Sequence, residues 1–204
     1  MDLHPPHRTY RLAGLSWSAI ELRDLAKAWI AVSLAFAIVL IGFSFSLKFL
    51  LGVLLAGFTV GTAFLLHELG HKVVAQRYGC FAEFRSFDQM LLLCILMSFF
   101  GFVFAAPGAV MIAGNVSRER NGRISAAGPL VNIILAMMFL AAYLVMPSLV
   151  FKYGAIINAW LAIFNMIPFW MFDGAKVWRW NKAVFAAMVA VSVGFLVAAN
   201  VVGA

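Results

Sequence analysis

Two histidines and a glutamate stand at the spacing of a metal site in the stretch TAFLLHELGHKVVAQRYG, residues 62–79. His67, Glu68 and His71 fit the pattern H-E-x-x-H. Because positions i and i+4 share one face of an α-helix, both imidazoles can reach a single metal ion. Neutral imidazole suits zinc, and a catalytic zinc site usually combines three protein ligands with a water molecule whose pKa falls to about 7. Glu68 could then accept a proton from that water as a general base.

The same three residues also allow a simpler interpretation, in which the histidines pack between helices or contact lipid head groups. They follow an apolar run that begins at Phe49. An ionised side chain near the middle of a membrane costs about 3 kcal/mol and must be compensated. The chain has only four histidines and eight acidic residues, so their concentration at this place favours the metal site.

A third metal ligand has to come from another part of the chain, and Asp173 is the strongest candidate. It ends the apolar run NMIPFWMFD and precedes Gly174. Its alternative role is that of a turn or capping residue before the glycine. The remaining acidic candidates lie near arginines, where salt pairs are the expected role: Glu83, Asp88 and Glu119.

Membrane helices are the elements that must position these residues. The 204-residue chain is 65% hydrophobic and 11% charged, and its mean hydropathy is +1.00. A soluble domain of this size cannot bury so much apolar surface, whereas uncharged runs of about 18 residues are typical of membrane spans. We predict an all-α integral membrane protein, a polytopic bundle of five to six membrane segments. The expected spans are at about 29–47, 49–78, 126–146, 154–172 and 183–202.

The N-terminal part of the chain precedes the first span. Its first 14 residues contain no apolar core, so no cleaved signal peptide is expected. Residues 15–28 are predicted to form a helix at the membrane interface. Ser18 and Glu21 have capping-box spacing there, and Asp24 and Lys27 can pair at i, i+3.

The net charge of +7 raises the possibility of nucleic-acid binding. The basic residues lie beside the apolar runs, however, and this arrangement orients a protein in a membrane. The lipid bilayer is therefore the expected partner of these charges, and no nucleic acid is expected.

The segment 89–114 is uncharged and long enough to cross the membrane, but its glycines and its proline break regular structure. If the segment dips in and returns, all of the 15 lysines and arginines except Lys48 and Lys152 lie on the side of the N-terminus, taken as cytoplasmic. If it crosses once, the basic residues divide almost evenly. The positive-inside rule therefore favours a re-entrant segment, whose backbone must be satisfied by protein or water.

Two further motifs give the chain a family resemblance. HELGH in one span is followed in a later one by N-x-x-P-x-x-x-x-D-G, formed by Asn165, Pro168, Asp173 and Gly174. This pair of motifs resembles the site-2 protease family of intramembrane zinc metalloproteases. The stretch AAGPLVN, residues 126–132, resembles the Gly-Pro-x-x-Asn signature of the same family.

The resemblance implies a role for each residue at the site. His67, His71 and Asp173 would bind Zn2+, and Glu68 would be the catalytic base. Asn165 would lie close to the scissile peptide and donate to its carbonyl oxygen, or would instead make a hydrogen bond between helices.

The resemblance covers a core from about 50 to 180. Within it, Asn132 is interpreted as a structural residue that ties helices together. We expect a cytoplasmic or interfacial N-terminal segment, 1–28, and a membrane-embedded metalloprotease domain, 29–204.

The segment PGAVMI, residues 107–112, is the candidate for substrate binding. A peptide bond inside a helix is shielded from water, so a substrate must unwind locally. An exposed strand edge at 107–112 could hold the unwound segment by strand addition, and the resemblance supports one strand of a re-entrant β-hairpin there. The alternative is a plain buried turn.

The implied function is that of an intramembrane zinc metalloprotease, which hydrolyses peptide bonds within or next to the transmembrane segments of a protein substrate. The implied location is a prokaryotic cell membrane, with the active site toward the cytoplasmic half; no oligomeric state is predicted. A non-catalytic scaffold or a metal transporter could retain the same motif. The complete set of ligand and base residues argues against the scaffold, and the scarcity of other polar residues in the spans argues against the transporter. A membrane metalloprotease of another H-E-x-x-H class would need a glutamate ligand in a later helix, and none is available.

Overall fold

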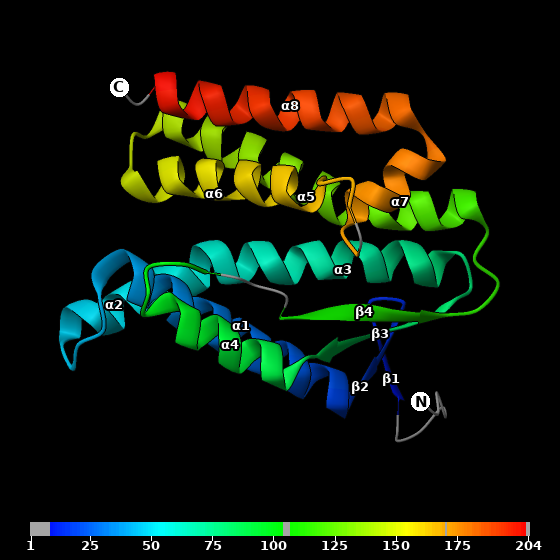
Figure 1. Cartoon of the computed structure of the whole chain (residues 1–204), viewed down its shortest axis with the longest axis horizontal. Coiled ribbons are helices and arrows are strands. Elements are labelled where there is room, and N and C mark those ends of the chain that lie inside the picture. The colour runs from blue at the N-terminus through cyan, green and yellow to red at the C-terminus, as the bar shows by residue number, and fades with distance from the viewer. Residues whose placement is uncertain (1–8, 104–106, 170, 203–204) are drawn as a thin grey trace. The chain divides into compact units, whose positions relative to one another are not determined.

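The computed structural model describes residues 9–103, 107–169 and 171–202. The chain divides into two compact units (Figure 1). The N-terminal unit comprises Met1–Leu65 and Ala75–Asn115, and the C-terminal unit comprises Leu66–Val74 and Val116–Ala204.

The described part of the N-terminal unit begins with a β-hairpin. Strands β1 (Thr9–Leu12) and β2 (Leu15–Ser18) pair in antiparallel fashion. Ala13 and Gly14 join them with φ angles of 52° and 77°, and two positive φ angles suit the tight turn of a hairpin. The prediction of a helix over 15–28 is therefore wrong for its first residues.

Helix α1 (Ala19–Ile41) is one continuous helix, in which the predicted interfacial helix runs into the first predicted span. The predicted cap is confirmed, because Ser18 Oγ accepts the backbone N–H of Glu21 at 3.1 Å. The predicted ion pair is confirmed as well, with Lys27 Nζ lying 3.2 Å from Asp24 Oδ1. The helix ends before the predicted residue 47, since Gly42 adopts a φ of 80°, which lies outside the helical range and which glycine tolerates because it has no Cβ atom.

The second predicted span is a continuous apolar helix of 31 residues. It consists of α2 (Leu47–Ala56), the π-helical turn η1 (Gly57–Gly61) and α3 (Thr62–Arg77). Gly79, with a φ of 73°, follows its end as predicted.

The π-helical turn packs closely against α1 within the N-terminal unit. The indole N–H of Trp29 donates to the carbonyl of Gly57 at 3.0 Å. A Cβ atom on Gly61 would lie 2.5 Å from the indole nitrogen of Trp29. These two glycines therefore make room for the tryptophan.

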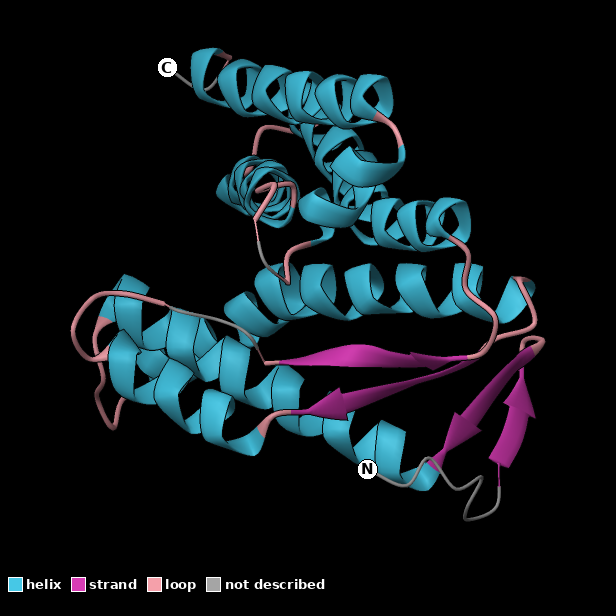
Figure 2. Ribbon diagram, turned by 45° about the vertical axis from the view of Figure 1, so that its right-hand side comes forward, coloured by secondary structure: helices cyan, strands magenta, loops and turns pink. Residues whose placement is uncertain are grey.

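Segment 89–114 contains a helix and a strand. Helix α4 (Asp88–Ser98) is followed by β4 (Gly108–Ala113), which pairs in antiparallel fashion with β3 (Phe81–Ser86) (Figure 2). The predicted strand at 107–112 is thus confirmed, and a plain buried turn is excluded. The partner strand precedes α4 in sequence, so the two strands do not form a tight hairpin. Residues 104–106 of this segment lie outside the described residues, and its re-entrant course stays a prediction.

The C-terminal unit is a helical bundle that also includes the middle of α3. Its helices α5, α6 and α8 run side by side (Figure 1). Ile133 of α5, Met166 after α6, Val177 of α7 and Met188 of α8 meet in its core. The bounds of these helices are Arg118–Val145 for α5, Leu149–Asn165 for α6, Asp173–Trp180 for α7 and Lys182–Val201 for α8.

The bounds of two helices in this unit, α5 and α6, differ from the prediction. α5 begins before residue 126, because Ser117 Oγ accepts the backbone N–H of Arg120 at 3.3 Å and caps the helix there. α6 ends at Asn165 rather than at 172. Pro168 lacks a backbone N–H and disfavours a helical conformation at the residue before it.

Among the described residues, four helices are long and apolar enough to cross a membrane: Ala19–Ile41, Leu47–Arg77, Arg118–Val145 and Lys182–Val201. Asp88–Ser98 and Leu149–Asn165 are shorter apolar helices. The chain is thus a mainly helical protein with the apolar helices of a membrane protein. It also contains two small sheets, which the prediction of an all-α class did not include.

Candidate metal centre

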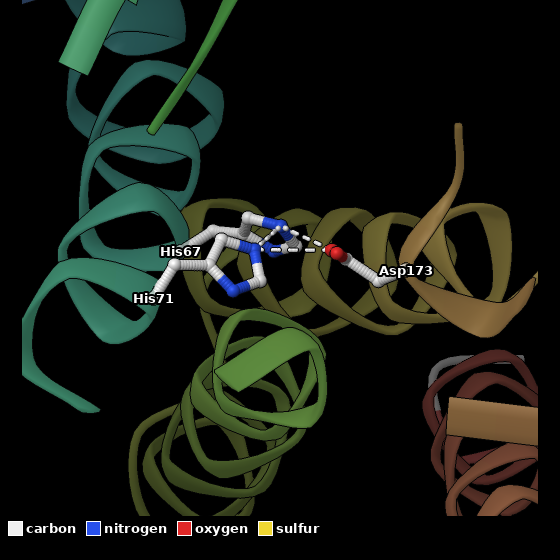
Figure 3. Close-up of side chains that lie close together, drawn as sticks. All are labelled: His67, His71 and Asp173. Atoms are coloured by element: carbon white, nitrogen blue, oxygen red, sulfur yellow. Dashed lines mark hydrogen bonds and ion pairs between the residues drawn. The ribbon is translucent and has the colours of Figure 1, made fainter. Parts of the chain in front are cut away.

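His67, His71 and Asp173 converge in the C-terminal unit. Their ligand atoms all lie within 4.8 Å of one another, and no other such cluster occurs among the described residues. Asp173 Oδ2 lies 3.4 Å from His67 Nε2 and 3.0 Å from His71 Nε2. Figure 3 shows the two imidazoles of α3 and the carboxylate at the start of α7 pointing toward one another. All three residues are at most 9% exposed.

The geometry of α3 brings the two histidines together. They are four residues apart on one helix and therefore share a face. Their Nε2 atoms lie 3.0 Å apart, and their rings meet edge to face at a centroid distance of 4.7 Å. This part of the site is thus built within a single helical turn.

Glycines allow α5 to approach the histidines. A Cβ atom on Gly128 would lie 2.4 Å from His71 Nε2 and 2.6 Å from His67 Nε2. A Cβ atom on Gly70 would lie 2.9 Å from the carbonyl oxygen of Ala127. This contact explains why the Gly-Pro-x-x-Asn motif has a glycine at position 128, because a side chain there would displace both imidazoles.

A close contact between helix ends positions Asp173. It is the first residue of α7, and a Cβ atom on Gly174 would lie only 2.2 Å from the carbonyl oxygen of Met166. The Asp-Gly pair thus lets α7 begin directly against the end of α6. Lys176 Nζ lies 3.6 Å from Asp173 Oδ1, so the carboxylate faces the histidines with one oxygen and an ammonium group with the other.

Hydrogen bonds hold each imidazole through its Nδ1 atom. His67 Nδ1 lies 2.6 Å from Asn132 Oδ1, and His71 Nδ1 lies 2.8 Å from the carbonyl oxygen of Ile124. A carbonyl oxygen can only accept, so His71 Nδ1 donates, and in the neutral imidazole Nε2 then keeps a lone pair. Metal-ligating histidines characteristically donate their other ring N–H to such a partner.

These residues fit a divalent cation. An Nε2 lone pair of His71 faces the Nε2 atom of His67 and an Asp173 oxygen across 3.0 Å each. Such a concentration of electron-rich atoms in a buried site needs a cation or a proton to compensate it. Two imidazole nitrogens and one carboxylate oxygen form a donor set that zinc accepts.

Glu68 and Lys72 are buried beside the ligands on α3. Glu68 is 9% exposed and Lys72 is 2% exposed. Their i, i+4 spacing places a carboxylate and an ammonium group on one face of the helix. Glu68 was predicted from the sequence and Lys72 was missed, although a lysine beside an H-E-x-x-H motif in an apolar span was a visible signal.

The two asparagines of the motifs make different contacts. The side-chain amide of Asn165 donates to the carbonyl of Leu161 in its own helix at 2.9 Å, rather than across helices. Asn132 does tie helices together, as predicted, because its Nδ2 donates to Asn158 Oδ1 on α6 at 3.1 Å. Its contact with His67 and the role of Asn158 were missed, although Asn158 interrupts the apolar run of α6.

The other acidic candidates are paired with basic residues, as expected. Lys27 Nζ lies 2.6 Å from Asp88 Oδ1, and Arg123 Nη2 lies 2.6 Å from Glu119 Oε1. Arg85 Nη2 lies 3.0 Å from Glu83 Oε1, and Ser18 Oγ also donates to that carboxylate. Glu83 is 5% exposed and belongs to β3, so the carboxylate of its salt pair is buried rather than solvated.

Comparison with known proteins then decides the family. The chain is 38% identical over 187 residues to a protein of Methanocaldococcus jannaschii named "Putative zinc metalloprotease MJ0611", and the match covers 88% of this chain and 94% of that protein. The chain belongs to this zinc metalloprotease family. A second protein of the same organism, "Zinc metalloprotease MJ0392", is 30% identical over 120 residues, which are 56% of this chain and 30% of that protein. No protein-family model matches the chain, and no solved structure matches it significantly.

Proposed function

We propose that this protein is an intramembrane zinc metalloprotease of the site-2 type, which hydrolyses peptide bonds within or next to transmembrane segments. The observation that carries the proposal is the convergence of His67, His71 and Asp173 in a buried site between apolar helices. Membership of a zinc metalloprotease family supports the same conclusion. The bilayer and a transmembrane protein substrate are the proposed partners.

His67, His71 and Asp173 are the proposed Zn2+ ligands. Zinc held there would supply Lewis-acid chemistry, lowering the pKa of a water molecule to about 7 and polarising a peptide carbonyl. The contribution of the chain is to present two neutral imidazoles and one carboxylate from fixed directions. Asn132 and the backbone carbonyl of Ile124 hold the imidazoles through hydrogen bonds with their Nδ1 atoms.

Glu68 is the proposed general base. It accepts a proton from the attacking water and returns that proton to the amine that leaves when the peptide bond breaks. Its burial next to the first ligand places the carboxylate where little bulk water competes for the proton. Asn165 is the proposed donor to the carbonyl oxygen of the scissile peptide. Its amide nitrogen has two N–H groups, of which one donates to the carbonyl of Leu161 and the other can serve the substrate.

The outer edge of β4 is the proposed docking place for an unwound substrate. At the other edge of this two-stranded sheet, side chains of α1 accept the outward N–H groups of β3. Glu21 Oε1 accepts the N–H of Phe84 at 3.0 Å, and Asp24 Oδ2 accepts the N–H of Ser86 at 3.3 Å. β4 pairs with β3 alone among the described strands, so its other edge can accept an extended peptide.

The register identifies which groups of β4 point outward. Phe84 is opposite Val110, and Ala82 is opposite Ile112. Because the N–H of Phe84 points away from β4, this pair belongs to the non-hydrogen-bonded positions of the ladder, which alternate along the strands. The N–H groups of Val110 and Ile112 therefore point toward the open edge.

Orientation in a prokaryotic cell membrane is proposed from charge. The arginines at the start of α5 and the basic residues of α7 lie on the cytoplasmic side if segment 89–114 re-enters. Residues 29–204 would then form the embedded protease domain, with the site in the cytoplasmic half and 1–28 at the cytoplasmic interface.

Cleavage of a single-span reporter in proteoliposomes tests the proposed function. The purified chain should cleave the reporter within or next to its span, and Glu68→Gln should abolish cleavage while leaving zinc bound. A wild-type chain that binds zinc but cleaves no membrane reporter would favour a non-catalytic scaffold. Zinc-dependent cation flux without cleavage would favour a transporter.

A further inference from the structure

We infer that Asn132 and Asn158 form a relay of side-chain amides that fixes the tautomer and the direction of the His67 imidazole. The inference rests on the proposed function, in which His67 is a metal ligand. Neither asparagine contacts the position of the metal, so both are positioning residues.

The relay is a chain of three hydrogen bonds in the C-terminal unit. His67 Nδ1 lies 2.6 Å from Asn132 Oδ1, and Asn132 Nδ2 donates to Asn158 Oδ1 at 3.1 Å. Asn158 Nδ2 then donates to the backbone carbonyl of Gly154 at 2.9 Å. Both asparagines are completely buried, with 0% of their surface exposed. The relay therefore runs from α3 through α5 to the backbone of α6.

The carbonyl of Gly154, at the end of the relay, determines which group donates in each hydrogen bond. The carbonyl of Gly154 can only accept, so the amide nitrogen of Asn158 must face it and the Asn158 oxygen must face Asn132. That oxygen requires the amide nitrogen of Asn132, which turns the Asn132 oxygen toward His67. Since this oxygen can only accept, His67 Nδ1 must carry the proton.

In the neutral imidazole, the Nε2 atom of His67 then carries a lone pair that points into the cluster. This atom lies 3.4 Å from Asp173 Oδ2 and 3.0 Å from His71 Nε2. A reversed Asn132 amide would present N–H groups to His67 Nδ1 and favour the tautomer with its proton on Nε2. That proton would occupy the position where a metal ion must bind.

The two histidines are controlled in different ways. The main-chain carbonyl of Ile124 fixes His71, and no side-chain substitution can reverse a carbonyl. His67 depends on two side chains, of which the second lies beyond direct contact with the ligand. A residue on α6 therefore influences a ligand on α3 through hydrogen-bond direction alone.

The competing explanation is that the Asn132–Asn158 bond only holds α5 against α6. That role predicts a loss of stability when either asparagine is replaced, and no change in zinc affinity per folded chain. A double substitution separates the two explanations. Removing one member of a buried pair leaves its partner unsatisfied, whereas replacing both by apolar residues of similar size can be nearly neutral for stability.

The test compares zinc affinity in detergent-purified, metal-stripped chains by competition with a chelating dye. Asn132→Leu with Asn158→Leu should fold with a melting temperature close to wild type and bind zinc about 10- to 100-fold more weakly, the usual effect of losing such a partner. Asn158→Leu alone should also weaken zinc binding, although Asn158 touches no ligand. Asn132→Asp keeps an oxygen acceptor for His67 Nδ1 and should retain more affinity than Asn132→Leu.

Asn200→Leu is the matched control. Its amide makes the same i to i−4 bond, to the carbonyl of Leu196 at 2.8 Å, but it lies exposed on α8. This variant should bind zinc as the wild type does. Equal zinc affinity in the wild type and the double variant would overturn the relay while leaving the proposed function intact.

Nitrogen-15 spectra of histidine-labelled, metal-free protein provide a second readout that a structural role would not change. The His67 signals, identified by their loss in His67→Gln, should show the proton on Nδ1 in the wild type and a shift toward the Nε2 tautomer in the double variant. An unchanged tautomer would overturn the relay. A wild type that binds no zinc would overturn the proposed function, and these spectra would still decide the tautomer.

Discussion

The Nε2 atoms of His67 and His71 lie 3.0 Å apart, one turn from each other on α3. The carbonyl of Ile124 accepts a hydrogen bond from His71 Nδ1, so Nε2 of the neutral His71 imidazole carries a lone pair. Asp173 adds a carboxylate oxygen 3.0 Å from His71 Nε2. This electron-rich centre, buried among apolar helices, needs a cation or a proton to compensate it.

Glu68→Gln should separate metal binding from catalysis. Glutamine has the same size but cannot accept a proton, so the variant should retain zinc and lose cleavage by about 100- to 10,000-fold, the usual range for a general base. Zinc content and reporter cleavage are measured on the same preparation. Residual cleavage near the wild-type rate would show that another group acts as the base.

Gly128→Ala should disturb both histidines without removing a polar group. The added Cβ atom would meet His71 Nε2 at 2.4 Å and His67 Nε2 at 2.6 Å, and a ligand misplaced by about 1 Å can cost about 100-fold in rate. We expect reduced zinc content and a comparable loss of cleavage.

Gly194→Ala is the control for the glycine prediction. Nothing lies within 4 Å of a Cβ atom at Gly194 on α8, so zinc content and cleavage should stay at wild-type values. If Gly128→Ala matched this control, α5 would not limit the space around the imidazoles.

Much of this site follows from local spacing, and the remainder depends on long-range contacts. His67 and His71 are predictable because a spacing of four positions places two residues on the same face of a helix. Predicting Asp173 as a ligand depended on the separate N-x-x-P-x-x-x-x-D-G motif. Nothing in the sequence of α3 indicates which distant carboxylate lies beside its histidines in the fold. Asn158 was missed because its importance lies in a chain of hydrogen bonds that no local pattern records.

The fold shows the same division. Apolar runs identified the main helices, but hydropathy continues past Ile41 and past Asn165, whereas the helices end there. Gly42 at a positive φ ends the first, and Pro168 prevents continuation of the second. The hairpin at Thr9–Ser18 was missed because its four-residue strands are too short for a clear alternating pattern.

Proline at Val110 or Ile112 should weaken substrate binding without affecting the metal. Both N–H groups point toward the open edge of β4, so proline removes a donor for the substrate and leaves the ladder with β3. Each lost hydrogen bond is worth about 1 kcal/mol, so kcat/KM should fall about fivefold at unchanged zinc content. Val110→Ala serves as the control, and equal cleavage by Val110→Pro and Val110→Ala would contradict docking at this edge.

A cysteine at Ser117 should be labelled from the cytoplasmic side. This residue caps α5 and follows segment 89–114, so its accessibility reports whether that segment re-enters or crosses. Impermeant thiol reagents are applied to right-side-out and inverted vesicles of a variant that lacks Cys80 and Cys94. Labelling only from outside would mean a single crossing and would reverse the proposed position of the site.

Zinc content tests the central claim most directly. Detergent-purified wild type is compared with His71→Ala and Asp173→Ala after zinc has been supplied, with folding followed by size-exclusion chromatography. The three-ligand site predicts about one zinc per chain in the wild type, and loss or a sharp reduction in both variants. A folded wild type without zinc, or an Asp173→Ala variant with full zinc content, would contradict it.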